Sequence, residues 1–167
     1  MNVTIVGAGI GGLATALFLH QQGHQARVFE SVSELRELGV GINLLPHAVR
    51  ELDTLGLLER VAESGVLTKE LLYFNKLGQR IWQEARGMDA GYKWPQVSIH
   101  RGRLQRILLD AVRERLGNDS VVTGHRLTAV ASHDGGVTTT FSVSSATPAS
   151  VDVTADVAVT ADGIHSA

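Results

Sequence analysis

Glycines near the start of the chain have a spacing that can bind a diphosphate. Gly7, Gly9 and Gly12 fit the pattern G-x-G-x-x-G, with Gly11 as an additional glycine. In this pattern the first glycine allows a tight turn, the second lets a diphosphate approach the backbone, and the third lets helix and strand pack closely. Glu30 stands about 20 residues further on, where a carboxylate accepts ribose hydroxyls and disfavours the 2′-phosphate of NADP.

The pattern needs a strand before it and a helix after it, and the sequence predicts both. Val3–Val6 is an uncharged, β-branched run, typical of a strand buried on both faces of a parallel sheet. Leu13–Gln22 has apolar residues at helical spacing, and Gly23 stands where a left-handed C-cap is expected. Ala26–Phe29 is the next predicted strand. This βαβ unit favours dinucleotide binding over a ligand-free glycine turn, without separating FAD from NAD.

Two arginines further along are candidates for contacts with anions. Arg36 precedes Gly39 and Gly41, which indicate a second close backbone approach, although the spacing fits an ordinary surface arginine equally well. Arg101 opens a predicted helix whose apolar stripe runs through Leu104–Leu116. A guanidinium beside free helical amides can bind an anion, and a solvated charge at a helix end is the alternative interpretation.

The remaining elements lead to a third candidate. Pro46 is placed as the first residue of a helix. Leu71–Gln83 and Leu127–Val143 each have the pattern of a hairpin. Asp162 follows the apolar strand Val157–Val159, at the end of a strand where open α/β sheets bind ligands.

The aromatic residues and histidines carry less information. Tyr73, Phe74, Trp82 and Trp94 are interpreted as packing residues, with a substrate pocket as the alternative for some of them. The seven histidines have no spacing typical of a metal site.

Composition narrows the function classes. The chain has 167 residues and a formal net charge of −2, which fits one domain and disfavours nucleic acid as a partner. It contains no cysteine, so disulfides, thiolate catalysis and cysteine metal sites are excluded, and a cytoplasmic location is weakly favoured. No apolar run is long enough to predict a membrane span, so we expect no membrane partner. The oligomeric state cannot be inferred.

Taken together, these segments resemble the FAD-dependent aromatic hydroxylases, the single-component flavoprotein monooxygenases. Within that family the sequence is most similar to the bacterial phenazine-modifying monooxygenases. The resemblance covers essentially the whole chain. It rests on GAGIGG at 7–12, FES at 29–31, RELGVGINLLP at 36–46, SIHRGRLQ at 98–105 and ADGIHSA at 161–167.

The resemblance implies an α/β fold. We expect a Rossmann-like βαβ FAD-binding domain with a parallel sheet and a β-meander, together with the first strands of a substrate domain. Residues 1–167 would form the N-terminal part of the FAD-binding domain, and roughly 68–98 would contribute to the substrate domain. Because members of the family are considerably longer, we expect the C-terminal part to be missing and these residues alone not to hydroxylate.

The resemblance also implies which residues bind FAD. The glycines would hold the pyrophosphate and Glu30 the adenosine ribose. Arg36 would lie near the flavin, and Arg101 near the ribitol and pyrophosphate. Asp162 belongs to an Asp-Gly motif that serves both FAD and NAD(P)H, and the backbone near Leu127 would contact adenine. The implied set is Gly7, Gly9, Gly11, Gly12, Glu30, Ser31, Arg36, Gly41, Ile42, Arg101, Gln105, Leu127 and Asp162, with no catalytic side chain and no metal ligand.

The chemistry that the family implies belongs to the flavin. Members reduce FAD with NAD(P)H, trap molecular oxygen as a flavin C4a-hydroperoxide and transfer one oxygen atom to a small, electron-rich aromatic substrate, here phenazine-like by similarity. The protein supplies position and a dry cavity. Two alternatives stay open. A NAD-binding Rossmann domain of a dehydrogenase would leave the Arg101 and Asp162 segments unexplained, and an inactive FAD-binding fragment would leave the chain without activity.

Overall fold

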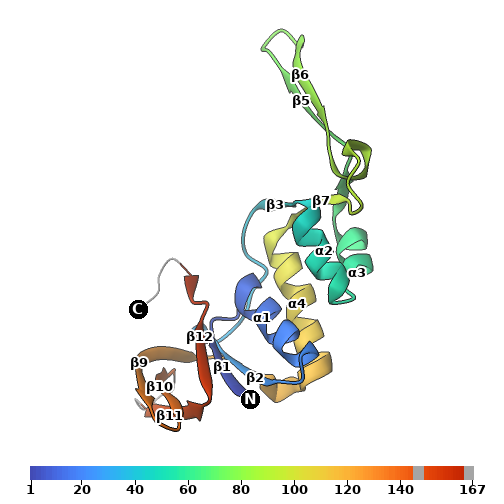
Figure 1. Cartoon of the computed structure of the whole chain (residues 1–167). Coiled ribbons are helices and arrows are strands. Elements are labelled where there is room, and N and C mark those ends of the chain that lie inside the picture. Colours follow the sequence, from blue (N-terminus) through green and yellow to red (C-terminus); the bar gives the residue numbers. More distant parts are fainter. Residues whose placement is uncertain (145–148, 164–167) are drawn as a thin grey trace. The chain divides into compact units, whose positions relative to one another are not determined.

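A computed structural model describes residues 1–144 and 149–163, which form two compact units (Figure 1). The first unit contains Met1–Arg36 and the chain from Leu108 onward, and the second contains Glu37–Ile107. The fold is α/β, as the sequence predicts, with one parallel sheet and several antiparallel strands.

A four-stranded parallel sheet of order β12-β1-β2-β8 is the centre of the first unit. Its strands are β1 (Asn2–Val6), β2 (Gln25–Phe29), β8 (Val121–Val122) and β12 (Val157–Thr160). In β1 the residues from Val3 to Val6 are all at least 96% buried, so the prediction of a strand covered on both faces is confirmed. The predicted βαβ unit is present, with α1 (Ile10–Gln21) packed against β1 and β2.

Helix α1 begins earlier than its sequence pattern predicts. The prediction places its start at Leu13, whereas the helix starts at Ile10 and includes Gly11 and Gly12. Glycine has a low helix propensity, but contacts in the folded protein override that preference. The predicted left-handed glycine after the helix is confirmed, since Gly23 has a φ of +80°.

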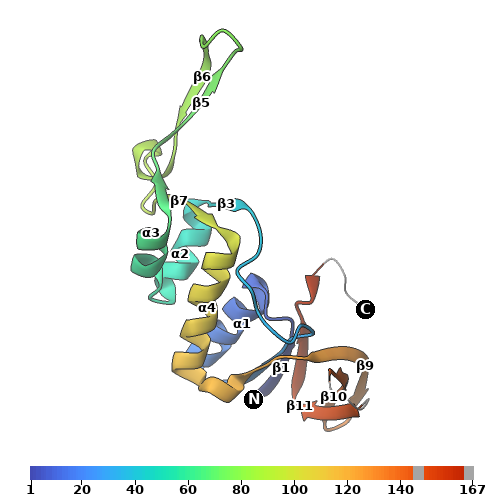
Figure 2. The ribbon, with the colours of Figure 1, turned by 180° about the vertical axis from the view of Figure 1, so that it is seen from behind.

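An antiparallel meander follows in the same unit (Figure 2). Its strands are β9 (His125–His133), β10 (Gly136–Val143) and β11 (Ala149–Ala155), so both the predicted hairpin and the expected meander are confirmed. Phe141 of β10 stacks on Phe29 of β2 with their ring centroids 4.6 Å apart, and Val6 of β1 completes this buried cluster. The cluster therefore joins the meander to the parallel sheet.

The second unit is built on a three-stranded antiparallel sheet of order β3-β7-β4. Its strands are β3 (Gly41–Leu44), β7 (Gln96–His100) and β4 (Val66–Thr68). Helices α2 (Pro46–Thr54) and α3 (Leu58–Ser64) both contact β7, whose Val97 and Ile99 are buried. Ser98 and His100 alternate with these residues and face the other side of the sheet. Pro46 starts α2 as predicted, but the sequence did not predict β3, β4 or β7.

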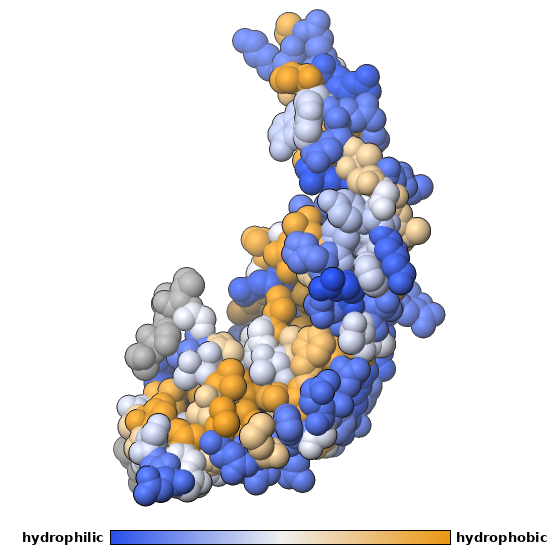
Figure 3. All heavy atoms as spheres, viewed as in Figure 1, coloured by the Kyte–Doolittle hydropathy of each residue, from blue (hydrophilic) through white to orange (hydrophobic). Residues whose placement is uncertain are grey.

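A hairpin of β5 (Glu70–Phe74) and β6 (Arg80–Ala85) belongs to the same unit, as predicted. The interpretation of its aromatic residues as packing residues holds only in part, because the rings of Tyr73 and Trp82 contact each other with centroids 5.7 Å apart but remain exposed. Tyr73 and Phe74 are each 54% exposed and Trp82 is 46% exposed, and Figure 3 shows apolar side chains among polar ones along this hairpin. Within the described residues β5 and β6 form a sheet of two strands only, which gives these side chains little to pack against. Trp94 is half-buried and donates its indole N–H to Asp53 at 2.9 Å.

Helix α4 (Arg101–Leu116) carries the apolar stripe that the sequence predicts. Leu104, Leu108 and Val112 on this stripe are at least 99% buried. Short 3-10 turns occur at Gly87–Ala90 and Asn118–Ser120. In the part of the chain that the structure describes, no helix is long and apolar enough to span a membrane.

Candidate dinucleotide-binding site

The glycine loop connects β1 to α1 and leaves the helix start open. Gly9 is the N-cap of α1, and among the described residues no side chain caps this end. The first N–H groups of an uncapped helix are available to a ligand, and the helix dipole favours an anion there. A Cβ at Gly9 or at Gly11 would meet no atom within 4 Å, whereas one at Gly12 would collide with the carbonyl oxygen of Gly7. The glycines therefore differ in role, because Gly12 serves packing and Gly9 borders open space.

The glycine loop meets the Ala-Asp-Gly segment from the other end of the chain. Gly7 has a φ of +102°, and a Cβ there would collide with the carbonyl oxygen of Ala161 and lie 3.1 Å from Cα of Asp162. Ala161 donates its N–H to the carbonyl of Val6 at 2.7 Å. The last four residues of the sequence motif, 164–167, lie outside the described residues.

This meeting point has the topology of a ligand site. β2 and β12 flank β1 on opposite sides, and both run parallel to it. The strand order therefore reverses at β1, and open α/β sheets bind ligands beyond the carboxyl ends of the strands at such a point. The loop after β1 and Asp162 after β12 both lie at this edge.

Glu30 holds the glycine loop to the end of β2. Its Oε2 accepts the backbone N–H of Ala8 at 2.8 Å. Its Oε1 accepts the hydroxyl of Ser31 at 2.9 Å and the N–H of Val32 at 3.0 Å. A carboxylate has about four lone-pair positions, so these bonds leave acceptor capacity for a further partner. The sequence predicted a contact with sugar, and the structure adds this bond to the loop.

Two further predicted residues, Arg36 and Leu127, belong to the first unit, where Arg36 lies on the surface and Leu127 in the meander. Arg36 forms an ion pair with Glu34 at 2.9 Å, and its side chain is 70% exposed. A pair this exposed contributes little stability, so the guanidinium is free to exchange partners. Leu127 lies on β9, an edge strand of the meander, and its side chain packs against the cluster of Val6, Phe29 and Phe141.

In the second unit, Arg101 lies across the loop that precedes β3. Its Nη2 donates to the carbonyl of Leu38 at 3.4 Å, and its backbone N–H donates to the carbonyl of Val40 at 3.0 Å. Gly39 has a φ of +133°, and a Cβ there would lie 2.7 Å from Nε of Arg101. Glycine at this position thus lets the exposed arginine lie against the backbone. Gln105 follows one helical turn after Arg101 and is half-buried.

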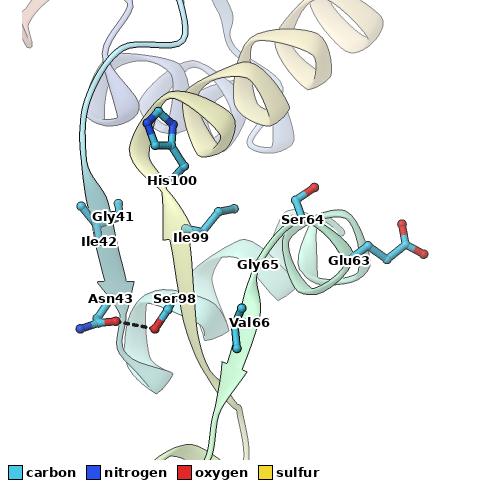
Figure 4. A pocket seen from close by; sticks show the side chains of 10 residues that line it. All are labelled: Gly41, Ile42, Asn43, Glu63, Ser64, Gly65, Val66, Ser98, Ile99 and His100. Carbon is cyan, nitrogen blue, oxygen red and sulfur yellow. Dashed lines mark hydrogen bonds between the residues drawn. The ribbon is translucent and has the colours of Figure 1, made fainter.

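Gly41 and Ile42 line a pocket of about 570 Å³ on the second unit (Figure 4). The other lining residues come from β3, α3, β4 and β7: Asn43, Glu63, Ser64, Gly65, Val66, Ser98, Ile99 and His100. Sequence reasoning missed these eight residues. The alternation of apolar and polar residues through 96–100 is a signal that would have identified β7 and the face that Ser98 shares with His100.

The arrangement of His, Asp and Glu side chains bears on whether the described residues could hold a metal ion. Across residues 1–144 and 149–163, no group of three or more His, Asp or Glu side chains is arranged to hold a metal ion.

A family profile described as FAD binding domain matches residues 1–167. The chain belongs to the FAD binding domain family. This FAD binding domain is 47% identical to phenazine 1,6-dicarboxylic acid hydroxylase PhzS of Lysobacter antibioticus, over 99% of the chain and 41% of the relative. It is 32% identical to 3-hydroxybenzoate 6-hydroxylase of Polaromonas naphthalenivorans, over 83% of the chain and 35% of the relative. The chain therefore spans less than half the length of these relatives.

Solved structures agree with the family. Klebsiella pneumoniae HpxO complexed with FAD and uric acid is 28% identical, with a TM-score of 0.71 over 91% of the chain and 37% of HpxO. The p-nitrophenol 4-monooxygenase PnpA of Pseudomonas putida has a TM-score of 0.84 over 98% of the chain and 41% of PnpA. At 24% identity, the similarity to PnpA supports the fold alone.

The residues of this FAD binding domain fit its cofactor. FAD carries a diphosphate, a ribose and a flavin. The first unit offers an uncapped helix start beside open space at Gly9, with Glu30 and its remaining acceptor capacity next to the loop. The second unit offers Arg101 as an exposed cation. The family match excludes the alternative of a NAD-binding dehydrogenase domain.

Proposed function

We propose that these residues are the FAD-binding part of an NAD(P)H-dependent monooxygenase that hydroxylates a small aromatic, phenazine-like substrate. The observation that carries the proposal is the meeting of the Gly7 loop with Ala161 and Asp162 at the ligand-binding edge of the sheet. The 47% identity to a relative named for hydroxylation of phenazine 1,6-dicarboxylic acid supports the substrate class.

Each part of the site then has a task. The N–H groups at the start of α1 bind the diphosphate, and Glu30 accepts the adenosine ribose hydroxyls while it keeps Ala8 in place. Ser31 fixes the Glu30 carboxylate by a hydrogen bond at 2.9 Å. Asp162 holds the cofactor from the strand on the other side of β1. Bound FAD would supply the redox chemistry, which uses a hydride from NAD(P)H and O2 to place one oxygen atom on the ring and the other in water.

The remaining implied residues are assigned to the flavin side and to adenine. Arg36 provides a positive charge that can move, because its side chain is exposed in a weak surface ion pair. Arg101 provides a fixed positive charge, because its side chain lies against a loop. The backbone of Gly41 and Ile42 borders the pocket where the ring would react, with Gln105 near Arg101. The edge of β9 near Leu127 is the adenine contact. Roughly residues 68–98, with the projecting hairpin, contribute to the substrate domain.

The experiment uses the full-length gene product, purified and loaded with FAD. We expect flavin absorbance, and oxidation of NADH or NADPH that yields hydroxylated phenazine 1,6-dicarboxylic acid only when O2 is present. Product formation without O2, or a protein that binds no flavin, would contradict the proposal. In the same assay, residues 1–167 alone are expected to give no hydroxylated product, and product from this piece would refute the expectation that it is inactive.

A further inference from the structure

Three polar side chains form a hydrogen-bonded row across the sheet of the second unit. Oγ of Ser98 on β7 donates to Oδ1 of Asn43 on β3 at 2.6 Å. Oγ1 of Thr68 on β4 lies 2.8 Å from the same Ser98 oxygen. The row therefore links residues from all three strands, and Figure 4 shows the bond between Asn43 and Ser98.

The direction of the row follows from the number of protons available. A serine hydroxyl has one proton, and Ser98 gives it to Asn43. Thr68 must therefore be the donor to Ser98. Because the Asn43 oxygen is the acceptor, the amide is oriented with its NH2 group turned away from Ser98, as Figure 4 shows. Asn43 is exposed and belongs to the pocket lining, so the NH2 group that faces away from Ser98 can donate to a further acceptor.

The pocket has few charged or titratable lining groups, and the imidazole of His100 is one of them. Its lining includes no lysine or arginine among the described residues, and its one carboxylate belongs to Glu63. Glu63 is exposed, and Figure 4 shows its carboxylate turned away from β3 and β7. An uncharged acceptor such as a ring nitrogen needs only a neutral donor of this kind.

We propose that Asn43 is a specificity-determining residue that donates a hydrogen bond to a ring nitrogen of an aza-aromatic substrate. The proposal rests on the proposed function, because it assumes that the pocket bordered by Gly41 and Ile42 receives the substrate ring. Ser98 is a positioning residue, which holds the amide in the donating orientation. Phenazine, the ring in the name of the relative at 47% identity, carries such nitrogens.

The test compares two flat bicyclic probes that differ in ring nitrogens, quinoxaline and naphthalene. Their dissociation constants are measured from the change in flavin absorbance of the full-length, FAD-loaded protein. In Asn43→Asp the Ser98 bond is kept and the free donor is replaced by an acceptor. We expect quinoxaline to bind roughly threefold to tenfold more weakly, the value of one neutral hydrogen bond, with naphthalene little changed.

A second variant and a control separate this result from a folding defect. Asn43→Leu should shift the ratio of the two dissociation constants in the same direction, while Thr68→Val, which leaves the Ser98–Asn43 bond in place, should leave the ratio near wild type. An unchanged ratio in both Asn43 variants overturns the proposal and leaves the proposed function intact. If the wild type binds FAD but neither probe, both this inference and the proposed substrate class are wrong.

Discussion

The carboxylate of Glu30 accepts the backbone N–H of Ala8 at 2.8 Å, across 22 positions of the chain. This bond connects the end of β2 to the loop after β1, so the acidic residue that would hold the ribose also shapes the loop that would hold the diphosphate. The two halves of the adenosine diphosphate site are therefore not independent. A change at Glu30 should alter both the stability of the loop and the affinity for FAD.

Glu30→Ala is expected to lower the free energy of unfolding by about 1–3 kcal/mol, because the N–H of fully buried Ala8 loses its acceptor. FAD affinity should fall as well. Urea unfolding without FAD and flavin fluorescence titration measure the two effects. Glu59→Gln, on an exposed side chain of α3, is the control and should change neither quantity appreciably. Equal stability and FAD affinity in Glu30→Ala and wild type would rule out the coupling.

Gly12→Ala should destabilise the fold by at least about 2 kcal/mol, because its Cβ would collide with the Gly7 carbonyl and lie 3.3 Å from Cγ2 of Ile5. The matched control is the neighbouring glycine of the same helix. Gly11→Ala has open space for its Cβ and should be neutral or stabilising by up to about 1 kcal/mol. Chemical denaturation of both variants measures this difference, and similar unfolding midpoints would show that the close packing is not required.

Arg101→Ala should weaken FAD binding about tenfold, which corresponds to the loss of one charge-assisted hydrogen bond. Arg103 is an exposed arginine on the first turn of the same helix and provides the matched control. Arg103→Ala should change the FAD dissociation constant less than twofold. The measurement is a flavin titration at fixed ionic strength. An equal loss of FAD affinity in both variants would show that Arg101 acts only through the general positive charge of the surface.

The parts of the fold that the sequence predicts have local signals. The strand at Val3–Val6 is a continuous uncharged, β-branched run, the helix at Pro46 starts with proline, and Asp134–Gly135 forms the turn between the alternating strands β9 and β10. Each signal lies within a few residues of the element that it predicts. The meeting of the Gly7 loop with Asp162 was accessible only through the general rule for strand ends and through the family motif.

The parts that were missed depend on partners far away in the sequence. β3 pairs with β7 through Gly41 and His100, and each strand is only four or five residues long. Short runs of this kind have weak patterns, and their pairing is decided by the fold. The Asn43–Ser98 hydrogen bond could not be predicted for the same reason, because its partners are 55 positions apart in the sequence. The aromatic residues of the β5–β6 hairpin were partly misinterpreted because residue type alone does not reveal whether another element covers them.

The most direct test of the central claim is the affinity of Gly9→Ala for FAD in the full-length protein. Gly9 has φ −71° and ψ 178°, which alanine adopts readily, and its Cβ would meet no atom within 4 Å. The free energy of unfolding should therefore stay within about 1 kcal/mol of wild type. The FAD dissociation constant should rise at least roughly tenfold, which corresponds to about 1.4 kcal/mol of binding free energy, because the methyl group occupies the approach of the diphosphate. A folded Gly9→Ala protein that binds FAD as tightly as wild type would contradict the claim that this loop holds the diphosphate.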